Sequence, residues 1–208
     1  VEPQKIAVVY DGVEIQNFSL KKEVNYEKNI LHLGAIDRQH GVEYLIRAIP
    51  LVVSEHNEAR FYIVGGGREF KNIFRLAKDL AVYNYCIFTN YLSTFEAQSF
   101  LKKCSIGIIP RADNLPNRIV TTLKIYEYWA SGTAVISSRL EGITEISNEN
   151  HDILFFKPGD YEDLAKKIIH LLNNPTELKR LQRNGFKTAK IYDWQTQAKK
   201  IVDFALRS

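Results

Sequence analysis

Short apolar runs alternate with longer amphipathic segments along most of this 208-residue chain. Runs such as NILHL, ARFYIV and AVIS are continuous and short, which is typical of strands buried on both faces of a sheet. Between them, apolar residues recur every three or four positions, as in an amphipathic helix. The runs predict strands at Asn29–Gly34, Ala59–Val64, Tyr85–Thr89, Ser105–Ile109, Ala134–Ser138 and Asp152–Phe156.

The amphipathic segments predict helices, and several of them begin at recognisable N-terminal signals. Ser93 has Glu96 three residues on, which is the pattern of a capping box. Asn174 and Pro175 stand where a cap residue and a first-turn proline are favoured. Helices are predicted at Gly41–His56, Phe70–Val82, Ser93–Lys103, Thr121–Ser131 and Trp194–Leu206, and also after Gly159-Asp160 and after Asn174.

Strands that alternate with helices predict an α/β fold, a Rossmann-like parallel sheet with helices on both faces. We expect an edge or linker segment at residues 1–20, with a short strand within Ile6–Phe18, a Rossmann-like domain at 21–190 and a C-terminal helix at 191–208. Ligands of such sheets bind beyond the carboxyl ends of the strands. The loop Pro110–Val120 is therefore the candidate binding loop.

Composition narrows the possible partners. The chain has 28 Lys and Arg against 24 Asp and Glu, a net charge of +4 without a concentrated basic stripe, so nucleic acid is not expected as a partner. Cys86, Cys104 and the scattered histidines form no ligand pattern, and no metal site is expected. No apolar run is long enough to span a membrane, which predicts a cytoplasmic protein with reduced thiols. Because the chain lacks an initiating Met, we expect a fragment of a longer protein.

The candidate chemistry follows the fourth predicted strand. Its loop carries Arg111, Asn117 and Arg118 and leads to a helix start, where unpaired backbone N–H groups favour an anion. Lys124 adds a positive charge there, and Glu127 lies one turn further on, close to the same face. A carboxylate among apolar neighbours needs a polar partner. An anion site beside such a carboxylate suits a nucleotide.

Several segments, taken together, carry a family resemblance. They are the helix start Gly41–Leu45 after NILHLG, and the strings YIVGGG, LKIYEYWASGTAVIS, EGITEI and ILFFKPGDYEDLAKKIIHLLNNP. In register and over nearly the whole chain, they resemble the C-terminal, donor-binding half of a GT-B glycosyltransferase of the large retaining family 4. Residues 6–18 are similar to the interdomain linker of that family.

The resemblance implies transfer of a sugar from a nucleoside diphosphate donor to an unknown acceptor, a glycan or a lipid, without a metal or other cofactor. Lys124 and Glu127 would be catalytic, with Glu127 accepting hydrogen bonds from the ribose hydroxyls. An N-terminal domain outside this chain would complete the cleft, so the isolated chain is not expected to turn over. The implied donor-binding residues are Gly34, Ala35, His40, Phe88, Thr89, Tyr91, Arg111, Arg118, Thr121, Thr122, Leu123, Lys124 and Glu127.

The chain departs from the family pattern at three positions around the diphosphate. Where the family usually has an Arg and a Lys on the diphosphate, this chain has Ala35 and His40. Where the family has a second acid, eight positions before Glu127, this chain has Ile119. His40 is then either a pH-sensitive phosphate contact or a loop residue ahead of a helix.

Two explanations of these departures stay open. In the first, other cations replace the missing ones, namely Lys124, Arg118, Arg111 and Arg38. In the second, the domain is a non-catalytic partner or scaffold. A nucleotide-sugar epimerase of the same build also remains possible, because fold alone does not choose a reaction. The basic run within Leu178–Tyr192 either rests on an anionic membrane as a peripheral contact or faces solvent.

Overall fold

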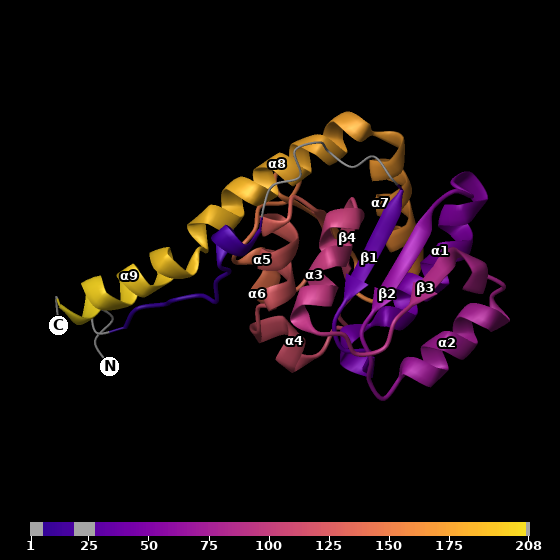
Figure 1. The fold of residues 1–208 in the computed structure, drawn as a ribbon, viewed down its shortest axis with the longest axis horizontal. Helices are drawn as coiled ribbons and strands as arrows, with labels where there is room; N and C mark the ends of the chain where they lie inside the picture. The colour runs from indigo at the N-terminus through magenta and orange to yellow at the C-terminus, as the bar shows by residue number, and fades with distance from the viewer. Residues whose placement is uncertain (1–5, 19–27, 207–208) are drawn as a thin grey trace.

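The computed structural model describes residues 6–18 and 28–206 of the chain. Its strands form one six-stranded parallel sheet in the order β3-β2-β1-β4-β5-β6. Figure 1 shows β4, β1, β2 and β3 of this sheet side by side. The strands are β1 (Asn29–Leu33), β2 (Arg60–Val64), β3 (Cys86–Phe88), β4 (Ile106–Ile109), β5 (Ala134–Ser138) and β6 (Ile153–Phe156). The strand order reverses between β1 and β4, which is the point where ligands of such sheets bind.

Helices cover both faces of the sheet, as predicted. Alternate residues of each strand face opposite sides, so Ile30 packs into one apolar core and Leu31 into the other. One core includes residues of α1 (Val42–Glu55), α2 (Phe70–Asp79) and α7 (Tyr161–Asn173), and the other includes residues of α3 (Thr94–Lys103), α5 (Leu123–Ala130) and α8 (Pro175–Ile191). The α/β prediction is confirmed.

Two of the predicted helix starts can be compared with the structure in detail. The Ser93 hydroxyl accepts a hydrogen bond from Glu96 N at 3.3 Å and the Glu96 carboxylate accepts one from Ser93 N at 2.9 Å, so the capping box is confirmed. Asn174 precedes α8 with Pro175 at its start, but the Asn174 amide donates to the His170 carbonyl instead of capping α8. The helix is correctly predicted there, and the side-chain cap is wrong.

The strand predicted within Ile6–Phe18 is wrong. The described residues 6–18 are extended, with a short 3-10 turn η2 (Ile15–Asn17) and one isolated bridge between Val13 and Asp193. Val13 N donates to the Tyr192 carbonyl at 3.0 Å, and Trp194 N donates to the Val13 carbonyl at 3.2 Å. The segment therefore bonds to the junction of α8 and α9 (Trp194–Ala205) and not to the sheet.

The prediction of a loop at Pro110–Val120 is incomplete, because this segment contains the short helix α4 (Leu115–Ile119). Asn114 caps this helix by accepting a hydrogen bond from Asn117 N at 3.0 Å, and a proline lies in its first turn. The string EGITEI forms a further short helix, α6 (Glu141–Thr144). The remaining described elements are the 3-10 turns η3 (Arg38–His40) and η4 (Tyr83–Tyr85).

The last helix extends away from the sheet, as Figure 1 shows. The sequence of this helix is amphipathic, as predicted, but its apolar side chains Trp194, Ile201 and Val202 are all exposed to solvent. Only Gln197 is buried among the described residues of α9. The helix therefore adds little to the core that holds the sheet.

Asp152, just before β6, is a fully buried carboxylate that links three elements. Its carboxylate accepts hydrogen bonds from Asn148 N and from the Thr188 hydroxyl, each at 2.8 Å. Its backbone carbonyl accepts one from Trp129 Nε1 at 2.9 Å. Through its carboxylate and its backbone carbonyl, Asp152 thus joins the segment ahead of β6 to both α8 and α5.

Replacing Asp152 by Ala should lower the free energy of unfolding by about 3 kcal/mol, because two charge-assisted bonds are lost and one of their donors, the Thr188 hydroxyl, stays buried. Asp152→Asn keeps the shape and should lower it less. Urea denaturation measures both, and the exposed substitution Asp203→Ala is the control. Equal stability of the parent and Asp152→Ala would show that the buried carboxylate does not hold these elements together.

Candidate functional site

The Lys124 side chain lies across the carboxyl end of β1. Thr122 is the N-cap residue of α5, so Lys124 is the second residue of the helix. A Cβ atom added to Gly34 would lie 2.4 Å from Lys124 Cε and 2.7 Å from Lys124 Nζ. A glycine at the end of β1 thus makes room for the ammonium group. Burial and the charge of Arg111 lower the pKa of Lys124 to about 8, although Glu127 raises it.

Glu127 lies one turn after Lys124 and is half-buried. Burial raises the pKa of its carboxyl group, and the Lys124 charge acts in the opposite direction. Among residues 6–18 and 28–206, no side chain or backbone group donates a hydrogen bond to this carboxylate. Its oxygens can therefore accept hydrogen bonds from a ligand.

The loops after β1 and β4 are fastened together by Asn117. Its amide donates to the carbonyls of Gln39 and Ala112, both at 2.8 Å, and Ala112 N donates to the Gln39 carbonyl at 3.1 Å. On the other side, Gly41 packs against Pro110 so closely that a Cβ atom on Gly41 would lie 1.7 Å from the Pro110 carbonyl oxygen. We call this set of contacts the loop clamp.

The loop clamp brings His40 beside Arg111, because the residues on either side of both are in contact. Arg111 is half-buried, donates to the Val120 carbonyl at 3.2 Å, and has its pKa lowered by burial. Burial, Lys124 and Arg111 together lower the pKa of His40 to about 4, against a raising effect of Asp37. The structure therefore brings His40 together with two cations, Arg111 and Lys124.

A second histidine, His32, was not among the predicted site residues. It lies in β1, is fully buried, and has its pKa held well below the usual range by burial first and then by Lys124 and His40. Within the described residues, neither ring nitrogen of His32 makes a hydrogen bond of normal geometry. The one available signal was a histidine inside the apolar run NILHL.

Three predicted donor residues lie at the end of β3 or just after it, on the far side of β2 from this group: Phe88, Thr89 and Tyr91. Gly65 N donates to the Thr89 hydroxyl at 3.3 Å, and a Cβ atom on Gly65 would lie 2.1 Å from the Gly34 carbonyl oxygen. The exposed Tyr91 ring lies against Gly66. Contacts thus run along the sheet edge from Lys124 through the glycines to Thr89. The glycines after β2 lie in the loop between β2 and α2, ahead of a turn at Arg68 and Glu69.

Three predicted residues have other partners in this structure. Arg118 forms an ion pair with Asp113 at 2.5 Å, and Arg38 forms one with Glu69 at 3.3 Å. Both arginines are exposed. Phe88 packs against the aromatic rings of α2, with its ring centroid 5.4 Å from that of Phe74. Of the proposed replacement cations, only Lys124 and Arg111 are drawn together by the fold.

The remaining predicted residues surround the same sheet edge. Ala35 follows Gly34, is half-buried, and brings no charge. Thr121 and Thr122 are half-buried ahead of α5, and Leu123 is exposed as its first residue. Ile119 is exposed on α4.

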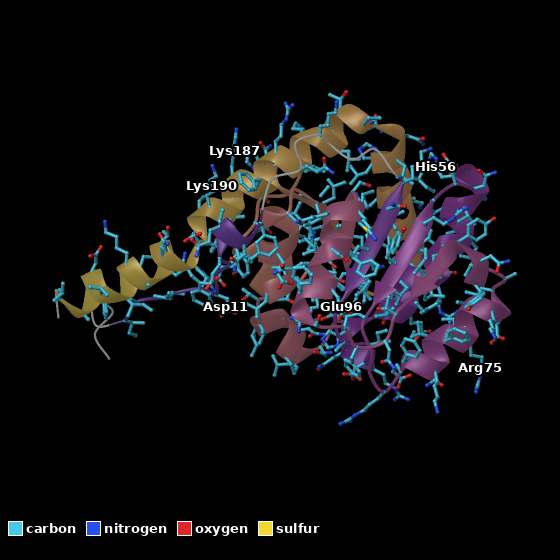
Figure 2. The ribbon with its side chains drawn as sticks, viewed as in Figure 1. Asp11, His56, Arg75, Glu96, Lys187 and Lys190 are labelled. Atoms are coloured by element: carbon cyan, nitrogen blue, oxygen red, sulfur yellow. The ribbon has the colours of Figure 1, made fainter. Side chains whose placement is uncertain are left out.

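The basic run on α8 faces outward. Figure 2 shows Lys187 and Lys190 pointing away from the sheet. Arg180, on the same helix, pairs with Glu177 and donates to the Asn150 carbonyl. Within the described residues, no helix combines the length and apolar character needed to cross a membrane. A peripheral membrane contact through α8 stays a prediction.

Known proteins resemble this chain in both sequence and fold. Residues 27–174 match the family described as glycosyl transferases group 1. An uncharacterized glycosyltransferase of Methanocaldococcus jannaschii is 26% identical over 96% of this chain and 53% of its own length. TarM of S. aureus, solved with UDP, superposes with a TM-score of 0.83 at 19% identity, over 96% of this chain and 39% of its own.

A second solved structure has the same fold. HepE of Anabaena in complex with UDP-glucose has a TM-score of 0.82 at 15% identity, covering 97% of this chain and 57% of that protein. The chain spans about half the length of the curated relatives that it matches. With the family match over residues 27–174 and this shared fold, the chain belongs to the glycosyl transferases group 1 and has the fold of a C-terminal GT-B domain.

Proposed function

We propose that this domain binds the nucleoside diphosphate of a sugar donor and that the whole protein transfers the sugar to an acceptor with retention of configuration. The observation that carries the proposal is Lys124 lying across Gly34, with the unpartnered Glu127 carboxylate one turn away. A cation and a hydrogen-bond acceptor side by side match a diphosphate and a ribose. Two structural neighbours were solved with ligands of this chemistry, HepE with UDP-glucose and TarM with UDP.

Lys124 and Arg111 would stabilise the diphosphate as it leaves. Breaking the bond to the sugar places negative charge on the diphosphate, and fixed cations lower the free energy of that transition state more than that of the bound donor. The N-terminus of α5 adds backbone N–H groups at the same place. Both cations are half-buried, which strengthens their attraction for the anion.

These groups would do this without a metal ion. Within the described residues, no three His, Cys, Asp or Glu side chains gather as a metal site. We assign the charge stabilisation to Lys124, Arg111 and the N-terminus of α5. Nucleoside diphosphate binding should therefore survive a chelator.

The acceptor, a glycan or a lipid, would bind mainly to an N-terminal domain, because this chain matches about half of its relatives' length. The isolated chain would then bind the donor without transferring the sugar. A cytoplasmic location, with α8 as a possible contact to an anionic membrane, belongs to the same proposal.

One observation favours a second candidate, a non-catalytic GT-B partner domain. Arg118 and Arg38 already pair with Asp113 and Glu69, and Ala35 supplies no charge. If Lys124 and Arg111 are too few to hold a diphosphate, the domain would have no donor site. Binding of a nucleoside diphosphate distinguishes the two candidates.

The test is calorimetric titration of the chain with UDP, GDP and ADP in the presence of EDTA, followed by Glu127→Ala. Losing a charged acceptor of ribose hydroxyls should weaken binding of the preferred nucleotide by about 10- to 100-fold. Inorganic pyrophosphate has no ribose, so its binding should be the same in the parent and in Glu127→Ala. This contrast separates ribose recognition from general damage to the site.

Glu162→Ala, an exposed position in the first turn of α7, is the matched control and should leave all affinities unchanged. Absence of binding by any of the three nucleotides to the folded parent would favour the non-catalytic partner. Equal nucleotide affinity of Glu127→Ala and the parent would remove Glu127 from the site.

A further inference from the structure

His40 lies where the sheet brings two cations together. Its turn is held by the loop clamp against the loop that carries Arg111, and both neighbours of His40 are in contact with that loop. The His40 side chain is half-buried, and its Nδ1 atom is buried without a hydrogen-bond partner in the described part of the chain. The Nδ1 nitrogen can take up a proton, and the Nε2 nitrogen, which is not among the buried unpartnered atoms, is the one that can face a ligand.

The titratable groups around His40 come from four parts of the chain. Arg111 from the β4 loop and Lys124 from α5 are positive, Asp37 of its own loop is negative, and His32 of β1 lies on the buried side. Burial is the largest cause of the lowered pKa of His40, and the two cations, which outweigh the one carboxylate, add to it. In the free protein His40 is therefore neutral at pH 7.

A diphosphate bound at Lys124 reverses this balance. Its negative charges neutralise Arg111 and Lys124, the two cations that act together with burial to keep the imidazole unprotonated. The ligand also supplies a strong acceptor for an imidazolium N–H. The buried and unpartnered Nδ1 atom gives the protonated ring little stabilisation without such a ligand.

We propose that His40 takes up one proton from the solvent when a nucleoside diphosphate binds, and so becomes the third cation of the site. This rests on the proposed donor site. The site then carries two charges when it is empty and three when it is filled. A permanent third cation would repel the other two in the empty protein, and a histidine avoids this repulsion.

The test is calorimetric titration of the 208-residue chain at pH 6.5 with UDP, GDP or ADP, whichever binds best, in two buffers whose ionisation enthalpies differ. The parent should take up roughly one proton more than His40→Gln. Its affinity for the nucleotide should therefore fall by up to tenfold for each unit that the pH rises. Lys124, with a pKa of about 8, is already protonated at pH 6.5 and contributes little. Protons exchanged by the nucleotide itself are the same for both proteins and cancel in the difference.

Two variants complete the design. His40→Lys carries its charge at all times, so it should bind without the extra proton and keep its affinity at pH 8. His170→Gln, far along the chain on α7, is the matched control and should behave as the parent. Equal proton uptake by the parent and His40→Gln, with nucleotide bound by both, overturns the proton uptake but leaves the donor site standing. No nucleotide binding by the parent overturns both.

Discussion

Replacing Lys124 by Met is expected to weaken binding of both nucleoside diphosphate and pyrophosphate by about 10- to 100-fold, the effect of losing one charge-assisted contact. Met retains most of the aliphatic chain that lies across Gly34, so the fold should persist. Unlike Glu127→Ala, this variant should lose pyrophosphate as well as nucleotide. Calorimetry with both ligands makes the comparison.

The pH dependence gives Lys124 a second signature. Because its pKa is lowered to about 8, Lys124 loses its charge as the pH rises past 8. Above pH 8 the affinity of the parent should therefore fall by more than the affinity of Lys124→Met, because only the parent loses the Lys124 charge in that window. Lys166→Met, exposed on α7, is the control. Pyrophosphate binding that is equal in the parent and Lys124→Met at pH 7 would rule out the proposed role.

The second large effect is expected at Gly41, where alanine should lower the free energy of unfolding by about 3 kcal/mol through strain and overpacking. Gly41 has a φ of +64°, and its added Cβ atom would overlap the Pro110 carbonyl oxygen at 1.7 Å. The loops must separate to make room. Because this breaks the loop clamp, nucleotide binding should fall with stability.

Gly159 offers a matched control for this substitution. Its φ is +82°, but the nearest atom to an added Cβ is the Tyr44 hydroxyl at 3.9 Å. Gly159→Ala should therefore carry the strain of a left-handed alanine alone, about 1 kcal/mol. Thermal and urea unfolding of both variants measure the difference. If the two glycines prove equally tolerant, close packing at Gly41 is not what holds the loops.

Most of the fold could be predicted from sequence because continuous apolar strands and amphipathic helices leave strong patterns. The β1 run at NILHL and the capping box at Ser93 are local signals, and both were read correctly. The strand prediction within Ile6–Phe18 is wrong because the Val13 backbone bonds to Tyr192 and Trp194, a contact across the length of the chain. Helix α4 was missed although Asn114 and the following proline signal a helix start.

The candidate site could be predicted only in part, because some of its contacts join residues near in sequence and others join residues far apart. Lys124 and Glu127 stand on one helix, so their spacing alone indicates a shared face. Arg118 and Arg111 look alike in the sequence, yet Asp113 pairs with the first and the loop clamp holds the second near Lys124. The environment of His40 depends on contacts with residues 110–117, which no local pattern reveals.

The loop clamp also constrains how this domain can be redesigned. Asn117 bonds to one carbonyl in each loop, so a change in either loop moves the hydrogen-bond partners of the other. In a mutant library that varies residues 39–41 alone, most variants would be lost because the changed loop no longer fits the unchanged one. The same would hold for a library that varies residues 110–117 alone. Varying both segments together, with Asn117 and Gly41 kept, samples new ligand preferences on an intact frame.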